Sequence, residues 1–166
     1  HLFKDTPLVD LPDHLKLQFV DSWAGKILST IMAEEQNYLG EWKITKILEA
    51  AGEYDSSDVM GRIARDIGSC PVVVYSFVDC PWCVATKELL DTDTYGAIET
   101  QIIELEDCGL SGKHIRAELA KMTGRTSMPC IFIHGKPIGG FSDGDPCGPG
   151  LKPLHESGKL LAMIRK

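Results

Sequence analysis

Two cysteines with two residues between them, Cys80 and Cys83, are the residues of this sequence best suited to chemistry. A β-branched run at 72–74 precedes them and a helical pattern follows, so Cys80 is expected at the start of a helix. There, unpaired N–H groups and the helix dipole stabilise a thiolate, the form of sulfur that attacks disulfides. Pro81 suits the first helical position, where an N–H has no intrahelical partner. Cys83 lies one turn further on, close enough to form a disulfide with Cys80 and release a bound substrate.

The same pair has two other interpretations: half of a zinc site, or two unrelated thiols of the core. Zinc would require a second pair at ligand spacing. The other cysteines offer no such pair and stand apart at Cys70, Cys108, Cys130 and Cys147. We therefore expect redox chemistry and no bound metal. Six cysteines with a single close pair favour free thiols in a reducing intracellular compartment over a secreted disulfide framework, without distinguishing cytoplasm from plastid or mitochondrion.

The composition is typical of a soluble globular protein: of 166 residues, 43% are hydrophobic, 7% aromatic and 25% charged. This apolar content can build a packed core without disulfides. A formal net charge of −7 argues against broad binding to nucleic acid or to anionic membranes, because both need a basic surface. No apolar run approaches the ~20 residues of a membrane helix, and the N-terminus shows no secretory-signal pattern. We therefore expect neither nucleic-acid nor membrane binding.

Residues 70–166 alternate between strand and helix patterns. This alternation predicts an α/β fold with a small mixed sheet flanked by helices. The segment 134–136 lies between two apolar runs and predicts a hairpin turn. The expected elements are strands at 72–74, 98–105, 129–133 and 137–138, and helices at 81–90, 111–122 and 151–165, with Gly124 ending the second helix.

Residues 1–69 predict an all-helical N-terminal extension of unknown role, because apolar positions recur at helical spacing. Gly40 and Gly52 are expected to end two of its helices, and the run 55–58 supplies good N-terminal caps for a third. The extension contains no cysteine, so we expect it to pack on the C-terminal domain (70–166) without supplying a catalytic group. The expected elements are an arm over 1–12 and helices over 13–36, 41–51 and 59–67.

Five motifs of the C-terminal domain occur in a characteristic order and spacing. They are Tyr75-Ser76, Cys80-Pro81-Trp82-Cys83, Ser127-Met128-Pro129, Phe132-Ile133-His134-Gly135 and Gly139-Gly140-Phe141-Ser142-Asp143. With these motifs, residues 70–166 resemble the glutaredoxin family. The resemblance implies a thioredoxin-like fold and glutathione as co-substrate, with no bound cofactor. The loop 144–150 is an insertion relative to the usual family spacing, and we expect it to expose Cys147.

Three residues near the thiols take their expected roles from this resemblance. In the family the proline corresponding to Pro129 is cis, and the residue before it, here Met128, pairs its backbone with the cysteinyl part of glutathione. From the sequence alone, Pro129 would be an ordinary trans proline that opens an edge strand. Trp82 stands where the family usually has tyrosine, and it either flanks the sulfur and packs on substrate or packs on the surface.

Further glutathione contacts are expected in two segments. Gly140 and Phe141 lead into Ser142 and Asp143, whose N–H groups and side chains suit the charged γ-glutamyl end of glutathione. The alternative for this segment is a hairpin exit with a helix N-cap. Arg125 either meets the glycyl carboxylate of glutathione or is a solvated charge at a helix end.

Phe77 is the clearest departure from the family. Glutaredoxins usually carry lysine three residues before the first catalytic cysteine, where it attracts the glycyl carboxylate and favours the thiolate. Phenylalanine can do neither, and Asp79 adds a charge that opposes the thiolate of Cys80. We therefore expect a less acidic Cys80 and weaker glutathione binding than in lysine-bearing relatives, partly offset by Arg125.

Together these features predict a glutathione-dependent thiol–disulfide oxidoreductase with Cys80 as nucleophile and Cys83 as resolving thiol. Its expected substrates are protein–glutathione mixed disulfides and protein disulfides, and its expected state is a monomer. One alternative is a dimer that binds a [2Fe–2S] cluster through Cys80 of each subunit and two glutathiones, which Pro81 and Cys83 oppose. Another is a thioredoxin-type enzyme with a reductase as electron donor, which Gly140 and Asp143 oppose.

Overall fold

The computed structural model describes residues 12–166, except for the side chains at positions 15, 19, 23 and 28–39. The expected N-terminal arm therefore lies almost wholly outside the described residues. The centre of the molecule is a four-stranded mixed sheet with the strand order β2-β1-β3-β4. β1 pairs parallel with β2 and antiparallel with β3, and β4 pairs antiparallel with β3. The strands are β1 (Val72–Ser76), β2 (Thr100–Glu104), β3 (Cys130–Ile133) and β4 (Lys136–Gly139).

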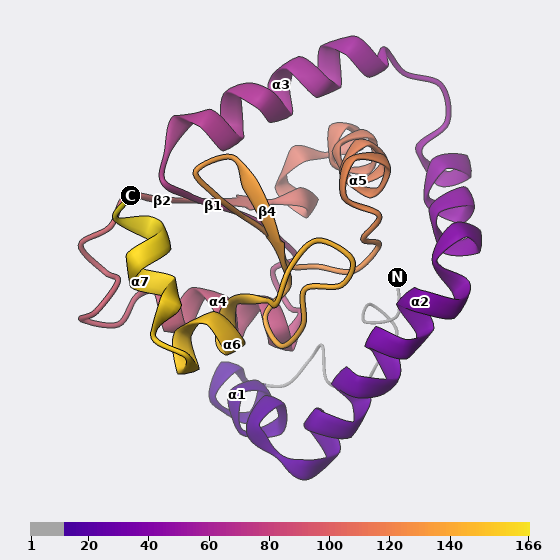
Figure 1. Ribbon diagram of the computed structural model, residues 1–166. Coiled ribbons are helices and arrows are strands. Elements are labelled where there is room, and N and C mark those ends of the chain that lie inside the picture. Colours follow the sequence, from indigo (N-terminus) through magenta and orange to yellow (C-terminus); the bar gives the residue numbers. More distant parts are fainter. Residues whose placement is uncertain (1–11) are drawn as a thin grey trace.

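Helices cover both faces of the sheet (Figure 1). On one face lie α3 (Ser56–Ser69) and α5 (Leu110–Thr123). On the other lie α4 (Pro81–Leu90), α6 (Leu151–Glu156) and α7 (Lys159–Ile164). A short 3₁₀ helix, η1 (Leu105–Cys108), follows β2. The arrangement confirms the α/β fold with a small mixed sheet that the alternation of patterns predicted.

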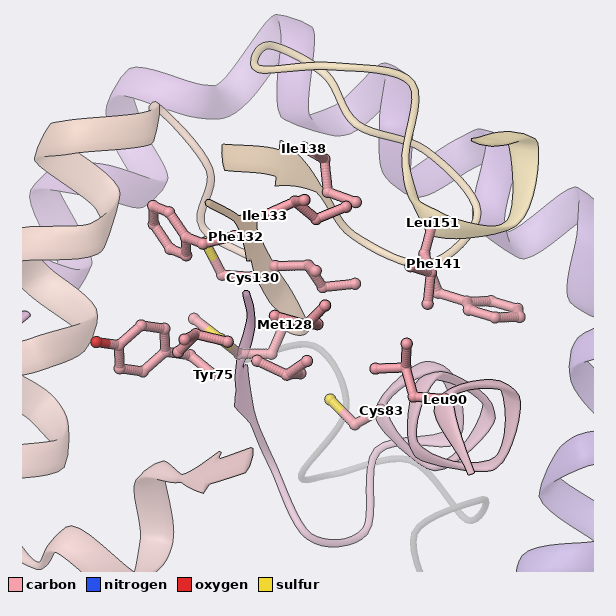
Figure 2. Close-up of a cluster of buried hydrophobic side chains, with 14 of the residues drawn as sticks. Tyr75, Cys83, Leu90, Met128, Cys130, Phe132, Ile133, Ile138, Phe141 and Leu151 are labelled. Carbon is pink, nitrogen blue, oxygen red and sulfur yellow. The ribbon is translucent and has the colours of Figure 1, made fainter. Parts of the chain in front are cut away.

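The core lies between the sheet and these two layers of helices. All five residues of β1 are buried, as expected for a β-branched run that is covered on both faces. Tyr75 and Phe132 meet edge to face with their ring centroids 6.0 Å apart (Figure 2). The Tyr75 hydroxyl donates to the Asp66 carboxylate of α3 at 3.3 Å. Ile63 of α3 is fully buried in the same core, so α3 is part of the α/β layers.

Three helix ends agree with the sequence-based prediction. The Asp55 carboxylate caps α3 by accepting a hydrogen bond from the Asp58 N–H at 3.2 Å. Gly52 directly follows α2 (Trp23–Ala51). Gly124 ends α5 in the left-handed region, with a φ of 72° that favours glycine.

Two other predictions of helix ends were wrong. α2 continues through Gly40 for a total of 29 residues, because one internal glycine costs only about 1 kcal/mol and no proline follows it. The helix is interrupted instead at Ser22, which lies between α1 (Asp13–Asp21) and α2. The Ser22 hydroxyl caps α2 by accepting a hydrogen bond from the Gly25 N–H at 3.1 Å. The final helix expected over 151–165 is divided into α6 and α7 at Gly158, which has a φ of 73°.

The N-terminal helices contact the α/β layers at separate places. Ile47 of α2 packs on Ala117 of α5. The Glu118 carboxylate of α5 accepts hydrogen bonds from the Tyr54 hydroxyl at 2.7 Å and from the Ser56 hydroxyl at 2.6 Å. α1 packs on α4, on the opposite side of the sheet (Figure 1). In the described part of the chain, none of the helices is long and apolar enough to cross a membrane.

Candidate active site

Cys80 occupies the position that the sequence predicts, directly before α4. It is the N-cap of the helix, with φ −68° and ψ 125°, and Pro81 is the first helical residue. The Cys80 carbonyl oxygen accepts the first hydrogen bond of the helix from the Val84 N–H at 2.9 Å. The sulfur therefore lies at the positive end of the helix dipole, next to the N–H groups of the first turn.

The two thiols of the motif differ in acidity. A hydrogen bond from the Cys83 thiol lowers the pKa of Cys80. Burial opposes this effect, while the N–H groups of Cys83 and Trp82 and the charge of Lys87 add to it. Burial, followed by interaction with the Cys80 sulfur, raises the pKa of Cys83 well above its ordinary value. The pair is therefore polarised, with the thiolate favoured on Cys80 and the proton held on Cys83.

The segment before β3 lies against the catalytic sulfur. The Met128–Pro129 peptide bond is cis, as the resemblance implied. The Cys80 thiol lies 3.8 Å from the Met128 carbonyl oxygen. Figure 2 shows Cys83 on α4 among the buried side chains of this part of the core. Trp82 is only 4% exposed, so the alternative that it packs on the open surface is wrong.

Arg125 contradicts one of its two sequence-based interpretations. Its side chain is 4% exposed, which is incompatible with a solvated helix-end charge. Its guanidinium donates to the Asp143 carboxylate at 2.8 Å, to the Asp145 carbonyl oxygen at 2.7 Å and to the Ser127 hydroxyl at 3.2 Å. A Cβ on Gly140 would lie 2.5 Å from the same guanidinium, which explains the glycine there. Arg125 thus joins residues 125–128 to residues 139–145, and we call these two segments the loop side of the site.

The loop after β4 is folded back on itself. Phe141 and Ser142 form a bend, Asp143 follows without regular structure, and α6 begins only at Leu151. The Gly140 N–H donates to the Asp143 carbonyl oxygen at 2.8 Å, and the Leu151 N–H donates to the Gly140 carbonyl oxygen at 2.9 Å. Phe141 is buried against the core, while Ser142 and Asp143 are half-buried.

Cys147 is not the exposed thiol that the inserted loop predicted. It is half-buried, and its thiol donates to the Thr123 carbonyl oxygen at 3.6 Å. Burial raises the pKa of Cys147, and burial raises the pKa of Cys130 to about 12. The six cysteines, all within the described residues, are free thiols. Of Cys80, Cys130 and Cys147, only Cys80 has an environment that favours the thiolate.

Arg116 of α5 is a residue of the site that the sequence did not reveal. Its guanidinium lies over the Phe77 ring, 5.4 Å from the centroid, and donates to the Thr126 carbonyl oxygen at 2.9 Å. Its buried Nε has no hydrogen-bond partner among the described residues. Burial lowers the pKa of Arg116 to about 10, which leaves it cationic at neutral pH. A cation therefore stands beside Phe77, and no local pattern signals it because the contact joins two distant elements.

α1 also reaches the site, which the sequence did not predict. The Lys16 side chain is 3% exposed and its ammonium lies 3.6 Å from the carboxylate of Asp79, the residue before Cys80. Val20 is 4% exposed and belongs to the same apolar cluster as Cys80 and Trp82. The charge of Asp79, which was expected to oppose the thiolate, is therefore paired with a cation.

These features define a class of protein. A four-stranded mixed sheet carries a Cys-x-x-Cys pair at the start of a helix, and a cis-proline segment lies beside the first of the two sulfurs. This combination is a thioredoxin-like fold with a thiol–disulfide site.

Comparison with known proteins places the chain within that class. The family model described as Glutaredoxin matches residues 72–138. Glutaredoxin-C6 from rice is 34% identical over 107 residues, which cover 63% of this chain and 84% of the rice protein. The crystal structure of the buckwheat glutaredoxin–glutathione complex is 31% identical and has a TM-score of 0.57, covering 66% of this chain and 90% of that one. The chain belongs to the glutaredoxin family, and the predicted thioredoxin-like glutaredoxin fold is confirmed.

Two further relatives are named as chloroplastic proteins, and this chain covers a smaller share of their length. Chloroplastic glutaredoxin-C4 from rice is 34% identical over 100 residues, which cover 59% of this chain. This chain spans 65% of the length of that relative. Chloroplastic monothiol glutaredoxin-S12 from Arabidopsis thaliana is 29% identical over 119 residues, which cover 72% of this chain and 61% of that protein.

Proposed function

We propose that this chain is a glutathione-dependent thiol–disulfide oxidoreductase in which Cys80 is the nucleophile and Cys83 the resolving thiol. The observation that carries the proposal is the place of Cys80 at the start of α4, with its sulfur 3.8 Å from the Met128 carbonyl oxygen, and the pKa lowered at Cys80 and raised at Cys83 supports it. A low pKa supplies the thiolate at neutral pH, and a hydrogen bond from Cys83 keeps it in place until a disulfide arrives. If the pKa values of the two thiols were equal, they would not indicate which cysteine is the nucleophile and which the resolving thiol.

The proposed cycle is two exchange reactions. The Cys80 thiolate attacks the glutathione sulfur of a protein–glutathione mixed disulfide, and the protein leaves as a thiolate that takes up a proton. The thiolate of a second glutathione then attacks the bound glutathione sulfur, which forms glutathione disulfide and restores the Cys80 thiolate. Alternatively, Cys83 attacks Cys80 and releases glutathione, which leaves an intramolecular disulfide for two glutathiones to reduce. No bound cofactor takes part in these steps.

The site offers partners for each end of glutathione. The Met128 backbone beside the Cys80 sulfur suits the cysteinyl part, as in other cis-proline sites of the family. Arg116 suits the glycyl carboxylate, since Arg125 is already occupied inside the protein. Ser142 and Asp143 suit the γ-glutamyl end. The other residues proposed to line glutathione are Trp82, Pro129, Gly140 and Phe141, with Arg125 holding the loop side in position.

The partners and setting follow from this chemistry. Besides glutathione, the proposed substrates are glutathionylated proteins and proteins with disulfides. We propose that the protein is a monomer. We also propose that it works in a reducing intracellular compartment, because such a compartment keeps glutathione and the six free cysteines reduced. The names of two relatives, both chloroplastic, favour a plastid.

Substituting each thiol in turn tests the proposal. We expect Cys80→Ser to lose at least ~10³-fold of its turnover of a small glutathione mixed disulfide, because the nucleophile is gone. We expect Cys83→Ser to keep most of that activity and to lose reduction of intramolecular protein disulfides. A dead Cys83→Ser variant beside an active Cys80→Ser variant would reverse the assigned roles.

A relative named as a monothiol glutaredoxin makes the cluster-binding alternative worth a direct test. In that alternative, Cys80 of two subunits and two glutathiones would ligate a [2Fe–2S] cluster. We expect anaerobically prepared protein to be colourless and monomeric on a sizing column. A brown dimer with visible absorption would replace the oxidoreductase proposal by a cluster carrier or sensor.

A further inference from the structure

α1 lies over the end of α4 that carries the catalytic thiol. It packs on α4, below it in Figure 1. Among the described side chains of α1, Lys16 and Val20 contact the site, and they lie four residues apart and so on one face of the helix. Lys16 pairs with Asp79, and Val20 enters the apolar cluster that contains Cys80. The partly buried Leu17 packs against the same cluster.

The site is closed in this arrangement. Cys80 is 2% exposed, and both Trp82 and Met128 are 4% exposed. Thiol–disulfide exchange requires the sulfur of the substrate to reach the Cys80 sulfur directly. A molecule of the size of glutathione needs part of this surface uncovered, and a glutathionylated protein needs much more. Reaction at Cys80 therefore requires an opening movement.

α1 is the element best suited to move. Of the described side chains of α1, Val20 and Lys16 are buried, and its two ion pairs to the rest of the molecule have exposed carboxylates: Asp79 is 56% exposed and Asp21, 3.3 Å from Lys152, is 72% exposed. Ion pairs of this kind hold weakly. The break at Ser22 leaves α1 joined to α2 by a single non-helical residue, where the chain can bend. By contrast, the loop side is tied by the buried guanidinium of Arg125.

We infer that α1 is an intramolecular cover of the catalytic site, which holds Cys80 unreactive while docked and admits disulfide substrates when it leaves. The inference deepens the proposed function and rests on it for the identity of the substrates. A minor open state of about 0.1–10% is usual for such equilibria, and the observed rate is the intrinsic rate multiplied by that open fraction. Weakening the docked state should therefore speed every reaction of Cys80.

Alkylation of Cys80 in the full-length, reduced protein measures this opening without glutathione. Two variants weaken docking in different ways: Lys16→Glu opposes Asp79 with a like charge, and Val20→Asp places a carboxylate in the apolar cluster. Lys159→Glu makes the same charge change at an exposed position on α7 and is the matched control. Because Cys70 and Cys83 lie on the same tryptic peptide as Cys80, the peptide is fragmented in the mass spectrometer to assign the label to Cys80. Rates are compared at their high-pH plateau, so that a change in the pKa of Cys80 does not affect the result.

We expect both variants to raise the plateau rate with iodoacetamide about tenfold or more, and the control to match the wild type. A maleimide carrying a bulky polymer should show a larger increase than iodoacetamide, because it needs a wider opening. Equal rates in the wild type and both variants would overturn the inference. If circular dichroism shows Val20→Asp to be unfolded, Lys16→Glu, checked for folding in the same way, decides.

Turnover of a glutathione mixed disulfide separates this inference from the proposed function. Faster alkylation in both variants, without turnover in any of the proteins, would leave the cover standing and reject the glutathione-dependent activity. Turnover in the wild type, with alkylation rates that the variants do not change, would reject the cover and leave the activity standing.

Discussion

The loop side of the site and α1 meet the same catalytic cysteine, but they are held by different kinds of interaction. On the loop side, a buried arginine satisfies three oxygens at 2.7–3.2 Å, and a glycine leaves space for its guanidinium. Among the described side chains of α1, Val20 and Lys16 are buried, and the carboxylates of its ion pairs face solvent. Buried, hydrogen-bonded charges are costly to break, whereas exposed ion pairs contribute little. The first region is therefore a permanent part of the binding surface, and the second can leave it.

The largest effect should come from breaking the loop side. Arg125→Met removes one partner of a buried ion pair and leaves the Asp143 carboxylate, Ser127 and a carbonyl oxygen without their donor. We expect the free energy of unfolding to fall by about 3 kcal/mol, measured by urea denaturation. Arg125→Lys, which keeps the charge but not the fork of donors, should lose less. A loss below ~1 kcal/mol for Arg125→Met would show that the loop side is not fixed by this residue.

Glu118 tests a permanent contact elsewhere, where the N-terminal extension joins α5. Glu118→Ala leaves the Tyr54 and Ser56 hydroxyls without their acceptor, so we expect the free energy of unfolding to fall by about 2 kcal/mol at pH 7. Burial raises the pKa of Glu118, but hydrogen bonds from Lys121, Ser56 and Tyr54 outweigh it and lower the pKa overall.

The sign of the pH dependence follows from that shift. Because the folded protein holds the Glu118 carboxylate with a lowered pKa, its contribution is present above the ordinary value of 4.5 and is lost as the pH falls through the folded pKa. The difference in stability between the wild type and Glu118→Gln should therefore shrink below about pH 4.5. Urea denaturation at pH 7, 4.5 and 3 checks this, and a constant difference would contradict it.

Arg116 and Phe77 should have intermediate effects, on binding and not on the fold. We expect Arg116→Ala to raise the apparent KM for glutathione about fivefold, because a partly exposed charge contact is worth about 1 kcal/mol or less.

From the sequence alone, Phe77→Lys would be expected to improve the affinity for glutathione up to about fivefold. With Arg116 over the ring, we now expect no more than about twofold. Steady-state kinetics measures both, with Arg65→Ala, an exposed charge on α3, as control. A large gain for Phe77→Lys would show that Arg116 does not reach the carboxylate.

The smallest effect should come from the outer ion pair of α1. Asp21→Ala removes the partner of Lys152, and because Asp21 is 72% exposed we expect a loss of at most about 0.5 kcal/mol. This corresponds to a fall of about 2 °C or less in the thermal unfolding midpoint. A fall of 5 °C or more would place α1 among the permanent parts of the site.

The sequence predicted the C-terminal domain better than the extension, and the reasons are local. Cys80 before Pro81 and Gly124 after α5 are helix-end signals that depend on neighbouring residues only. Gly40 failed as such a signal because a glycine inside a helix is a modest cost that a long helix tolerates. The fold and the place of Cys80 at a helix start could therefore be predicted, apart from the broken helices at Ser22 and Gly158.

The contacts that complete the site could not be predicted, since each joins elements far apart in the chain. The sequence left two interpretations of Arg125 open, because two of its three oxygen partners, at Asp143 and Asp145, lie 18 and 20 positions away. Arg116 meets Phe77 only because the fold brings α5 against the segment between β1 and α4. Lys16 lies 63 positions before its partner Asp79, in a helix whose pattern predicted burial but not the surface it would bury against.

The length of α2 has a mechanical consequence for α1. α2 is anchored near its C-terminal end, where Ile47 and Ala51 pack on α5, and it carries α1 at the other end. With a rise of 1.5 Å per residue, the arm from Ile47 back to Trp23 is about 36 Å long. Tilting such a lever by about 5° at its pivot moves the far end by about 3 Å, which is comparable to the reach of an ion pair. A partner that bound α2 far from the thiols could thereby shift α1 relative to Cys80.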